Sequence, residues 1–302
     1  MPVTADPALV EQRIVEAAAA LPAYGGVTGW AALRWAGGRW FSGSRANGEL
    51  LPVWLATGEA DIRPQPGFCV SAERLDPRDL CLLNGLRMTS LVRSVCFEMR
   101  YASNDRLAVV ALDMAAFNDL VSIREAHEYA GEHSGWKGIG RCRGAIPRAD
   151  ENSWSPPEVL MRLGWTEDAG MPRPLCNAPL FDLDGRHIGT PDLVDPVAGV
   201  IGEYDGVWHL ADARRDRDLE REAGFRAHGL EGATMVRGDL ADPTAFVQRL
   251  TAAYDRASDI PDARRTWTLE QPDWWVDTST VDARRALDDL QREIWLRHRR
   301  AW

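Results

Sequence analysis

The sequence predicts a mixed α/β protein, and the order of its segments is the main reason. The first 145 residues combine helical segments with short strand-like pieces, which indicates an α+β domain. Beyond them the order is helix, three strands, helix, strand, helix, which is typical of an α/β module. The composition agrees, because 302 residues with 45% hydrophobic and 26% charged side chains suffice for two ordinary globular domains.

The first domain, residues 1–145, is predicted from its helix and strand signals. Helices are expected at residues 8–20, 90–99, 104–117 and 122–133, and strands at residues 51–55 and 68–71. Pro22 and the glycines after it end the first helix, and either Asn104 or Asp105 is suited to cap the third. Several glycines and Pro147 then interrupt the pattern, so the domain boundary is placed near residue 145.

The second domain, residues 151–256, begins with a well-capped helix. Ser155 is suited to the cap, the two prolines after it fit the first turn, and Glu158 stands where a capping-box acid belongs. Asp184-Gly185 predicts a hairpin turn between the first two strands of this domain. Strands are expected at residues 176–181, 188–193, 200–204 and 234–236, and further helices at residues 211–228 and after Asp242.

The tail, residues 257–302, is rich in tryptophan and is expected to end in a single helix over residues 281–300. Arginines gather at the C-terminal end of that helix, where cations suit the helix dipole. The tryptophans are most simply interpreted as core or interface residues, with stacking on unpaired bases as the alternative.

Charge and cysteine content limit the classes of function. Thirty-five basic and forty-five acidic residues give a formal net charge of −10, which excludes coating of nucleic acid by bulk positive charge. Any contact with DNA must therefore be local or bridged by a metal. The five cysteines show no spacing typical of a zinc site. The sequence has no signal-like leader and no apolar run of about 18 residues, so we expect a cytoplasmic protein without a membrane segment.

Three carboxylates gather at the ends of two predicted strands. If Asp195 pairs with Val200 across a four-residue loop, the same antiparallel register sets Asp192 opposite Glu203. Asp205 shares a strand face with Glu203, since side chains alternate along a strand. Carboxylates crowded in this way repel one another, so we expect a divalent cation to balance them. Mg²⁺, or Mn²⁺ in its place, suits a site built from Asp192 and Glu203.

The second domain resembles the PD-(D/E)xK, or restriction-endonuclease-like, nucleases over roughly residues 151–256. It is more closely similar to the branch related to very short patch repair endonucleases, and to the domain that many actinobacterial proteins carry behind an AbiEi-like antitoxin region. The matching residues are Ser155, Glu158, Arg162, Gly170–Pro174, Asp192, Glu203–Gly206, His209, Asp218, Arg221, Gly229 and Val236–Leu240. Their order and spacing together carry the resemblance.

The resemblance implies a metal-dependent phosphodiesterase that acts on DNA, in defence or repair. Asp192 and Glu203 would hold the Mg²⁺ or Mn²⁺ ion, and Glu158 would reach it through water. DNA is the implied partner, and a homodimer or a second protein partner is left open. Phosphate contacts are expected from the arginines Arg162, Arg214 and Arg221.

One departure from the family pattern concerns the general base. Asp205 stands where the family has lysine, and Lys137 is the sole lysine of the chain. Arginine stays protonated and is a poor base. His209 is therefore the best substitute, as the base or as the group that orients the attacking water, since imidazole titrates near neutral pH. The implied catalytic set is Glu158, Asp192, Glu203, Asp205 and His209.

A second hypothesis is a non-catalytic DNA-binding regulator or antitoxin, in which the nuclease-like domain is only a scaffold. The upstream region weakly resembles AbiEi-like proteins at Gly85–Ser90, Arg93 and Ala111–Asp113. The N-terminal winged helix usual in those proteins is not evident in the sequence, which weakens the regulator hypothesis.

The individual signals also have plain structural interpretations. Asp205-Gly206 alone resembles a turn, and Glu158 alone resembles a first-turn acid of a helix. The two proposed functions differ in whether the carboxylates are ionised and whether they are paired with arginine. An enzyme needs Asp192 and Glu203 ionised and unpaired by arginine, whereas a scaffold would neutralise them with salt bridges.

Overall fold

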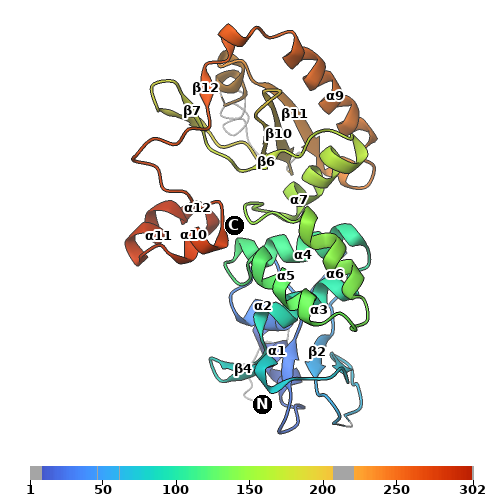
Figure 1. The fold of residues 1–302 in the computed structure, drawn as a ribbon. Coiled ribbons are helices and arrows are strands. Elements are labelled where there is room, and N and C mark those ends of the chain that lie inside the picture. The colour runs from blue at the N-terminus through green and yellow to red at the C-terminus, as the bar shows by residue number, and fades with distance from the viewer. Residues whose placement is uncertain (1–8, 46, 61, 207–220, 301–302) are drawn as a thin grey trace. The chain divides into compact units, whose positions relative to one another are not determined.

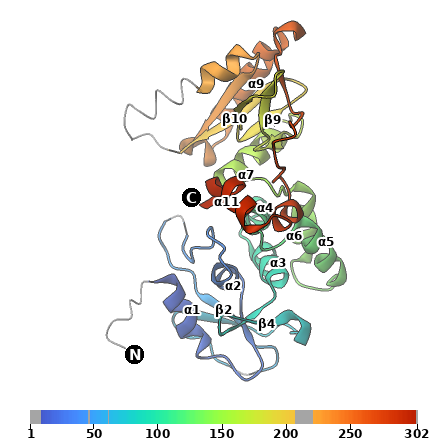
Figure 2. The ribbon, with the colours of Figure 1, turned by 90° about the vertical axis from the view of Figure 1, so that its left-hand side faces the viewer.

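The structure is a computed structural model that describes residues 9–45, 47–60, 62–206 and 221–300 (Figures 1 and 2). The chain divides into two compact units, Met1–Ala149 and Asp150–Trp302, and the tail after residue 257 belongs to the second. Both units contain helices and strands, so the mixed α/β class predicted from the sequence is confirmed. No helix among the described residues is long and apolar enough to cross a bilayer.

Within the described residues, the first unit is a five-stranded mixed sheet with helices packed beside it. In sheet order the strands are β3 (Phe68–Ser71), β2 (Val53–Ala56), β1 (Gly26–Thr28), β5 (Leu86–Thr89) and β4 (Leu80–Leu83). The helices are α1 (Val10–Ala18), α2 (Trp30–Trp35), α3 (Leu91–Tyr101), α4 (Asp105–Phe117), α5 (Ile123–Glu132) and α6 (Ile139–Ala145). Figure 1 shows α3 to α6 gathered in one helical layer.

Side-chain caps begin three of the α-helices described in this unit, namely α3, α4 and α5. Asn104, rather than Asp105, caps α4, because its Oδ1 accepts the Leu107 N–H at 2.9 Å. The hairpin β4–β5 is missing from the elements predicted above, although Asn84-Gly85, both with positive φ, is a typical hairpin turn. Helix α6 is also missing from the prediction, because it lies in the glycine-containing segment that the sequence analysis interpreted as a boundary.

Glu98, on α3, makes the stability of the first unit depend on pH. Its carboxylate accepts the Trp30 N–H at 2.8 Å, and burial raises its pKa from 4.5 to about 7. The folded state therefore binds this proton more tightly than the unfolded state does. The resulting stability is complete below pH 4.5 and is lost as the pH rises through about 7.

We expect Glu98→Gln to flatten this pH dependence, because glutamine keeps an acceptor for Trp30 but does not ionise. Between pH 5 and pH 8 the free energy of unfolding of the wild type should fall by about 2 kcal/mol more than that of the variant. Urea unfolding at the two pH values measures this difference, with the exposed Glu59→Gln as the control. Equal slopes for wild type and Glu98→Gln would contradict the assignment.

In the described residues, the second unit contains two sheets. Strands β11 (Glu231–Val236), β10 (Val200–Asp205), β9 (Leu193–Asp195) and β6 (Leu175–Cys176) form the larger sheet in this order. Strands β12 (Trp267–Thr268), β7 (Leu180–Asp182) and β8 (His187–Gly189) form the smaller sheet. Strand β10 is antiparallel to β9 and parallel to β11. The larger sheet is accompanied by α7 (Pro156–Leu163), helical residues 221–227 and α9 (Thr244–Ser258).

Two of the predicted strands are each divided in the structure. Residues 176–181 hold the end of β6 and the start of β7, because Asn177, with φ +45°, turns the chain between the two sheets. Residues 188–193 hold parts of β8 and β9, which are separated by Pro191, a residue without the N–H that a strand ladder requires. The hairpin turn predicted at Asp184-Gly185 does join β7 to β8.

The single terminal helix predicted for residues 281–300 is wrong. The segment forms three short helices, α10 (Val281–Arg285), α11 (Asp289–Trp295) and α12 (Arg297–Arg300). The division arises at Asp288, which accepts the Gln291 N–H at 2.8 Å, while Gln291 Oε1 accepts the Asp288 N–H at 3.0 Å. This reciprocal capping box starts a new helix in the middle of the predicted one.

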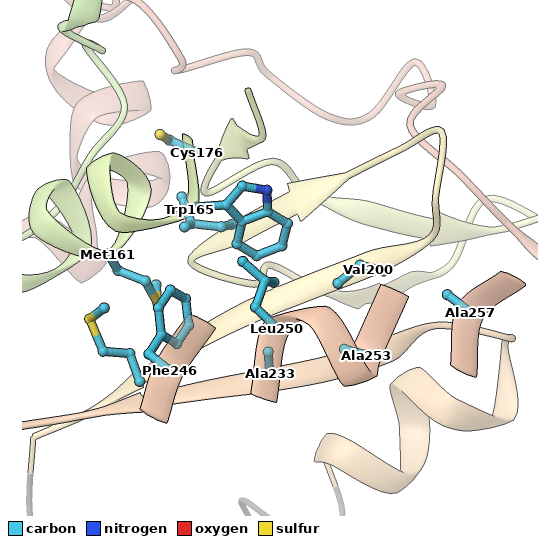
Figure 3. Close-up of a cluster of buried hydrophobic side chains, with 11 residues drawn as sticks. Met161, Trp165, Cys176, Val200, Ala233, Phe246, Leu250, Ala253 and Ala257 are labelled. Atoms are coloured by element: carbon cyan, nitrogen blue, oxygen red, sulfur yellow. The ribbon is translucent and has the colours of Figure 1, made fainter. Parts of the chain in front are cut away.

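A buried apolar core holds one face of the larger sheet against α7 and α9. Figure 3 shows Met161, Trp165, Phe246 and Leu250 packed together above the strands. A Cβ added at Gly202 would lie 2.9 Å from the Trp165 ring, so glycine is required there for the ring to approach β10. The core therefore fixes the position of the strand that continues to Glu203.

The opposite face of the same sheet packs against helical residues 221–227. Val194 and Ile201 are buried in one cluster with Phe225 and Leu230. Side chains alternate along β10, so Glu203 lies on the same face as Ile201. Glu203 is thus on the face that the helix with Arg221 covers.

Candidate functional site

The register predicted for the two acidic strands is confirmed. Asp195 pairs with Val200, Val194 with Ile201 and Leu193 with Gly202 across antiparallel β9 and β10, and Asp192 and Glu203 are the next residues beyond the last of these pairs. Asp192 immediately precedes β9, and its Oδ2 accepts the Tyr204 N–H at 2.8 Å. This hydrogen bond holds the Asp192 carboxylate against β10, beside the residue that follows Glu203.

Glu158 lies in the first turn of α7 and is only 5% exposed. Ser155 caps the helix as predicted, since its Oγ accepts the Glu158 N–H at 3.4 Å. The Glu158 carboxylate accepts three hydrogen bonds, from the Trp154 N–H at 2.8 Å, the Ser155 hydroxyl at 2.7 Å and Asn177 Nδ2 at 2.8 Å. These three hydrogen bonds determine the orientation of the Glu158 carboxylate, and the bond from Asn177 is not part of the helix cap.

Asp192 and Glu158 influence each other electrostatically. Burial and, to a lesser extent, the negative charge of Asp192 together raise the pKa of Glu158 from 4.5 to about 7, against the lowering effect of its three hydrogen bonds. Burial also raises the pKa of Asp192, against the opposing effects of the Tyr204 N–H and of Arg221. Two carboxyl groups from distant parts of the sequence thus share one poorly solvated region. We call Glu158, Asp192 and Glu203 the acidic site.

Glu203 is paired with Arg221, which the sequence analysis assigned to DNA contacts. Arg221 Nη1 donates to Glu203 Oε2 at 3.2 Å, and Nη2 lies 3.1 Å from Oε1. Nη2 also donates to the Thr190 carbonyl oxygen. The Arg221 side chain is 42% exposed, so this ion pair is partly screened by solvent. Arg221 is therefore an ion-pair partner of the acidic site in this arrangement.

The other predicted site residues differ in their exposure to solvent. Asp205 ends β10 and is exposed. Arg162 is only 1% exposed, so its guanidinium lies in the interior and offers no surface to DNA in this arrangement. His209 and Arg214 lie outside the described residues.

Asn177 is a member of this region that sequence reasoning missed. Its Nδ2 contacts Glu158, and its backbone N–H donates to the Asp192 carbonyl oxygen at 2.9 Å. A lone asparagine after a short strand carries no recognisable motif. A weak signal was nevertheless present, because asparagine is one of the few residues that adopt a positive φ readily.

The acidic site offers oxygen donors, which suit a hard divalent cation, but within the described residues its carboxylates are not gathered closely enough to form a complete set of ligands. Asp192 and Glu203 offer carboxylate oxygens, and Asn177 Oδ1 is a buried oxygen that accepts no hydrogen bond within the described residues. In the same part of the chain, no three His, Cys, Asp or Glu side chains are gathered as a metal-binding group. A cation bound by Glu203 would have to displace Arg221.

The acidic site therefore combines carboxylates of unequal environment with one arginine, which is suited to binding a cation or a phosphate group. Comparison of the chain with protein-family models, with curated proteins and with solved structures finds no match. The functional assignment accordingly depends on the residues of the acidic site themselves.

Proposed function

We propose that the chain is a metal-dependent DNA endonuclease that hydrolyses phosphodiester bonds at the acidic site, in defence or repair. The observation that supports the proposal is the hydrogen bond from the Tyr204 N–H to Asp192 Oδ2, which holds the Asp192 carboxylate against β10, the strand that carries Glu203. Buried Glu158 adds a third carboxyl group within electrostatic reach of Asp192. Such a concentration of negative charge in a poorly solvated region is costly unless a cation balances it.

Each residue of the acidic site has a distinct proposed role. Asp192 and Glu203 hold the Mg²⁺ or Mn²⁺ ion, while Glu158 accepts hydrogen bonds from its water. The chemistry supplied by a bound cation is polarisation of the scissile phosphate and a lower pKa of the attacking water. Arg221 contacts a DNA phosphate once it leaves Glu203, because a guanidinium suits phosphate as well as carboxylate. His209 accepts the proton of the attacking water.

The second candidate is a DNA-binding regulator or antitoxin that uses a nuclease-like scaffold without catalysis. One observation favours it, namely that Arg221 contacts both carboxylate oxygens of Glu203 at 3.1–3.2 Å. A permanent ion pair of this kind would neutralise a metal ligand and make the site structural. The two candidates therefore differ in whether divalent cations bind at Asp192 and Glu203.

Cleavage assays with an isosteric variant test the proposal. Supercoiled plasmid and single- and double-stranded oligonucleotides are incubated with the full chain in Mg²⁺, Mn²⁺ or EDTA. We expect cation-dependent cleavage that Asp192→Asn lowers by more than about 10²-fold, because the variant keeps an acceptor for Tyr204 but loses the charge. The control Asp255→Asn, on the exposed side of α9, should retain wild-type cleavage.

Thermal unfolding supplies a readout that needs no substrate. A cation at 100 times its Kd should stabilise the folded wild type by about 2.7 kcal/mol, and Asp192→Asn should lose this gain. If the wild type binds DNA but neither cleaves it nor gains stability with any cation, the regulator becomes the better assignment.

A further inference from the structure

Asn177 connects two members of the acidic site that come from separate elements. Its Nδ2 donates to Glu158 Oε2 on α7, and its backbone N–H donates to the carbonyl oxygen of Asp192 before β9. Both bonds are within 2.9 Å, and Asn177 is 3% exposed. One buried residue thus bridges the Glu158 side chain and the Asp192 backbone.

The orientation of the Asn177 amide is determined by its partners. Nδ2 also donates to the Asn152 carbonyl oxygen at 2.8 Å, so both amide hydrogens have acceptors. In return, Asn152 Nδ2 donates to the Asn177 carbonyl oxygen at 3.1 Å. Oδ1 faces away from these acceptors and is the buried oxygen that has no hydrogen-bond partner in the described chain. An orphaned buried acceptor costs free energy, so a purely structural asparagine would be expected to satisfy it.

We propose that Asn177 is a positioning residue of the acidic site, which holds the Glu158 carboxylate at a fixed place relative to Asp192. This inference rests on the proposed function, since it concerns how the cation is held. Asn177 acts through Glu158 and does not touch the reacting atoms. Residues that orient the ligands of a cation typically change its affinity by 10–100-fold when they are removed.

Asn177→Gly is the suitable test variant, because glycine tolerates φ +45° and keeps the backbone bond to Asp192 while the amide is lost. The affinity of the EDTA-treated full chain for Mn²⁺ is measured by isothermal titration calorimetry. We expect the variant to bind Mn²⁺ about 10–100-fold more weakly than the wild type. The control Asn84→Gly removes an asparagine with φ +48° from the first unit and should leave the affinity unchanged.

A double-mutant cycle with Glu158→Gln separates positioning from a general loosening of the fold. If Asn177 acts through Glu158, then Asn177→Gly should have little further effect on Mn²⁺ affinity in the Glu158→Gln background. Full additivity of the two losses, or an unchanged affinity for Asn177→Gly, would overturn the inference and leave the proposed function standing. A wild type that binds no Mn²⁺ would overturn the proposed function and this inference with it.

Discussion

Replacing His209 with alanine is expected to lower the rate of DNA cleavage about 10²–10⁴-fold, which is the usual contribution of a general base. His209 follows Glu203 by six residues in the sequence, and because Lys137 is the sole lysine, His209 is the residue proposed as the general base. DNA binding should survive the change, because phosphate contacts come from arginine and the cation. Single-turnover cleavage and fluorescence anisotropy measure the two properties separately.

The pH profile and a second variant define the role of His209. If it accepts a proton, the rate of wild-type cleavage should rise with pH as the imidazole loses its proton, and His209→Gln should recover little activity. Near-complete recovery in His209→Gln would show that the residue only positions other groups. The base would then be sought at Asp205 or in hydroxide bound to the cation.

Replacing Trp165 with alanine is expected to cost the second unit about 3–5 kcal/mol of stability. Trp165 is 0% exposed, its Nε1 donates to the Tyr254 hydroxyl at 3.2 Å, and its ring fills the space above Gly202 (Figure 3). Alanine leaves a cavity beside β10 and removes the hydrogen bond. Guanidinium unfolding followed by far-ultraviolet circular dichroism measures the loss.

A matched control for this prediction exists in the tail. Trp274 is 54% exposed, so Trp274→Ala deletes the same atoms without opening a cavity in the core. We expect it to cost less than about 1 kcal/mol. Equal losses for Trp165→Ala and Trp274→Ala would show that the core described around β10 does not carry the stability of the second unit.

Much of the acidic site could be predicted because its two strands are neighbours in the sequence. Asp195 is followed by the four-residue loop Pro196–Gly199, and Asp195 Oδ1 accepts the Val197 and Ala198 N–H groups to close that loop. A short loop favours antiparallel pairing of the two strands it joins, and the predicted pair Asp195–Val200 is the first pair of the observed ladder. The Ser155 cap was predictable for the same reason, since its partner is three residues away.

Side-chain partners far apart in the sequence could not be predicted in this way. Arg221 has the pattern of a solvated helix residue, yet it contacts Glu203 because the helix packs over that face of the sheet. Arg162 matched a DNA-binding position but is buried by the packing of α7. No local pattern distinguishes these outcomes, because an arginine has similar helix propensity whether it is buried, paired or exposed.

The sequence by itself determined the mixed α/β class, helix caps such as Ser155 and the register of β9 against β10. Tertiary structure alone decided how the acidic site is supported. Arg299 of α12 donates to Asn152 Oδ1 at 2.8 Å across 147 residues, and Asn152 in turn bonds Asn177, which holds Glu158. Such contacts form only when the loss of chain entropy on bringing distant segments together is offset by burial of apolar surface. Both quantities depend on the whole fold and not on any local segment.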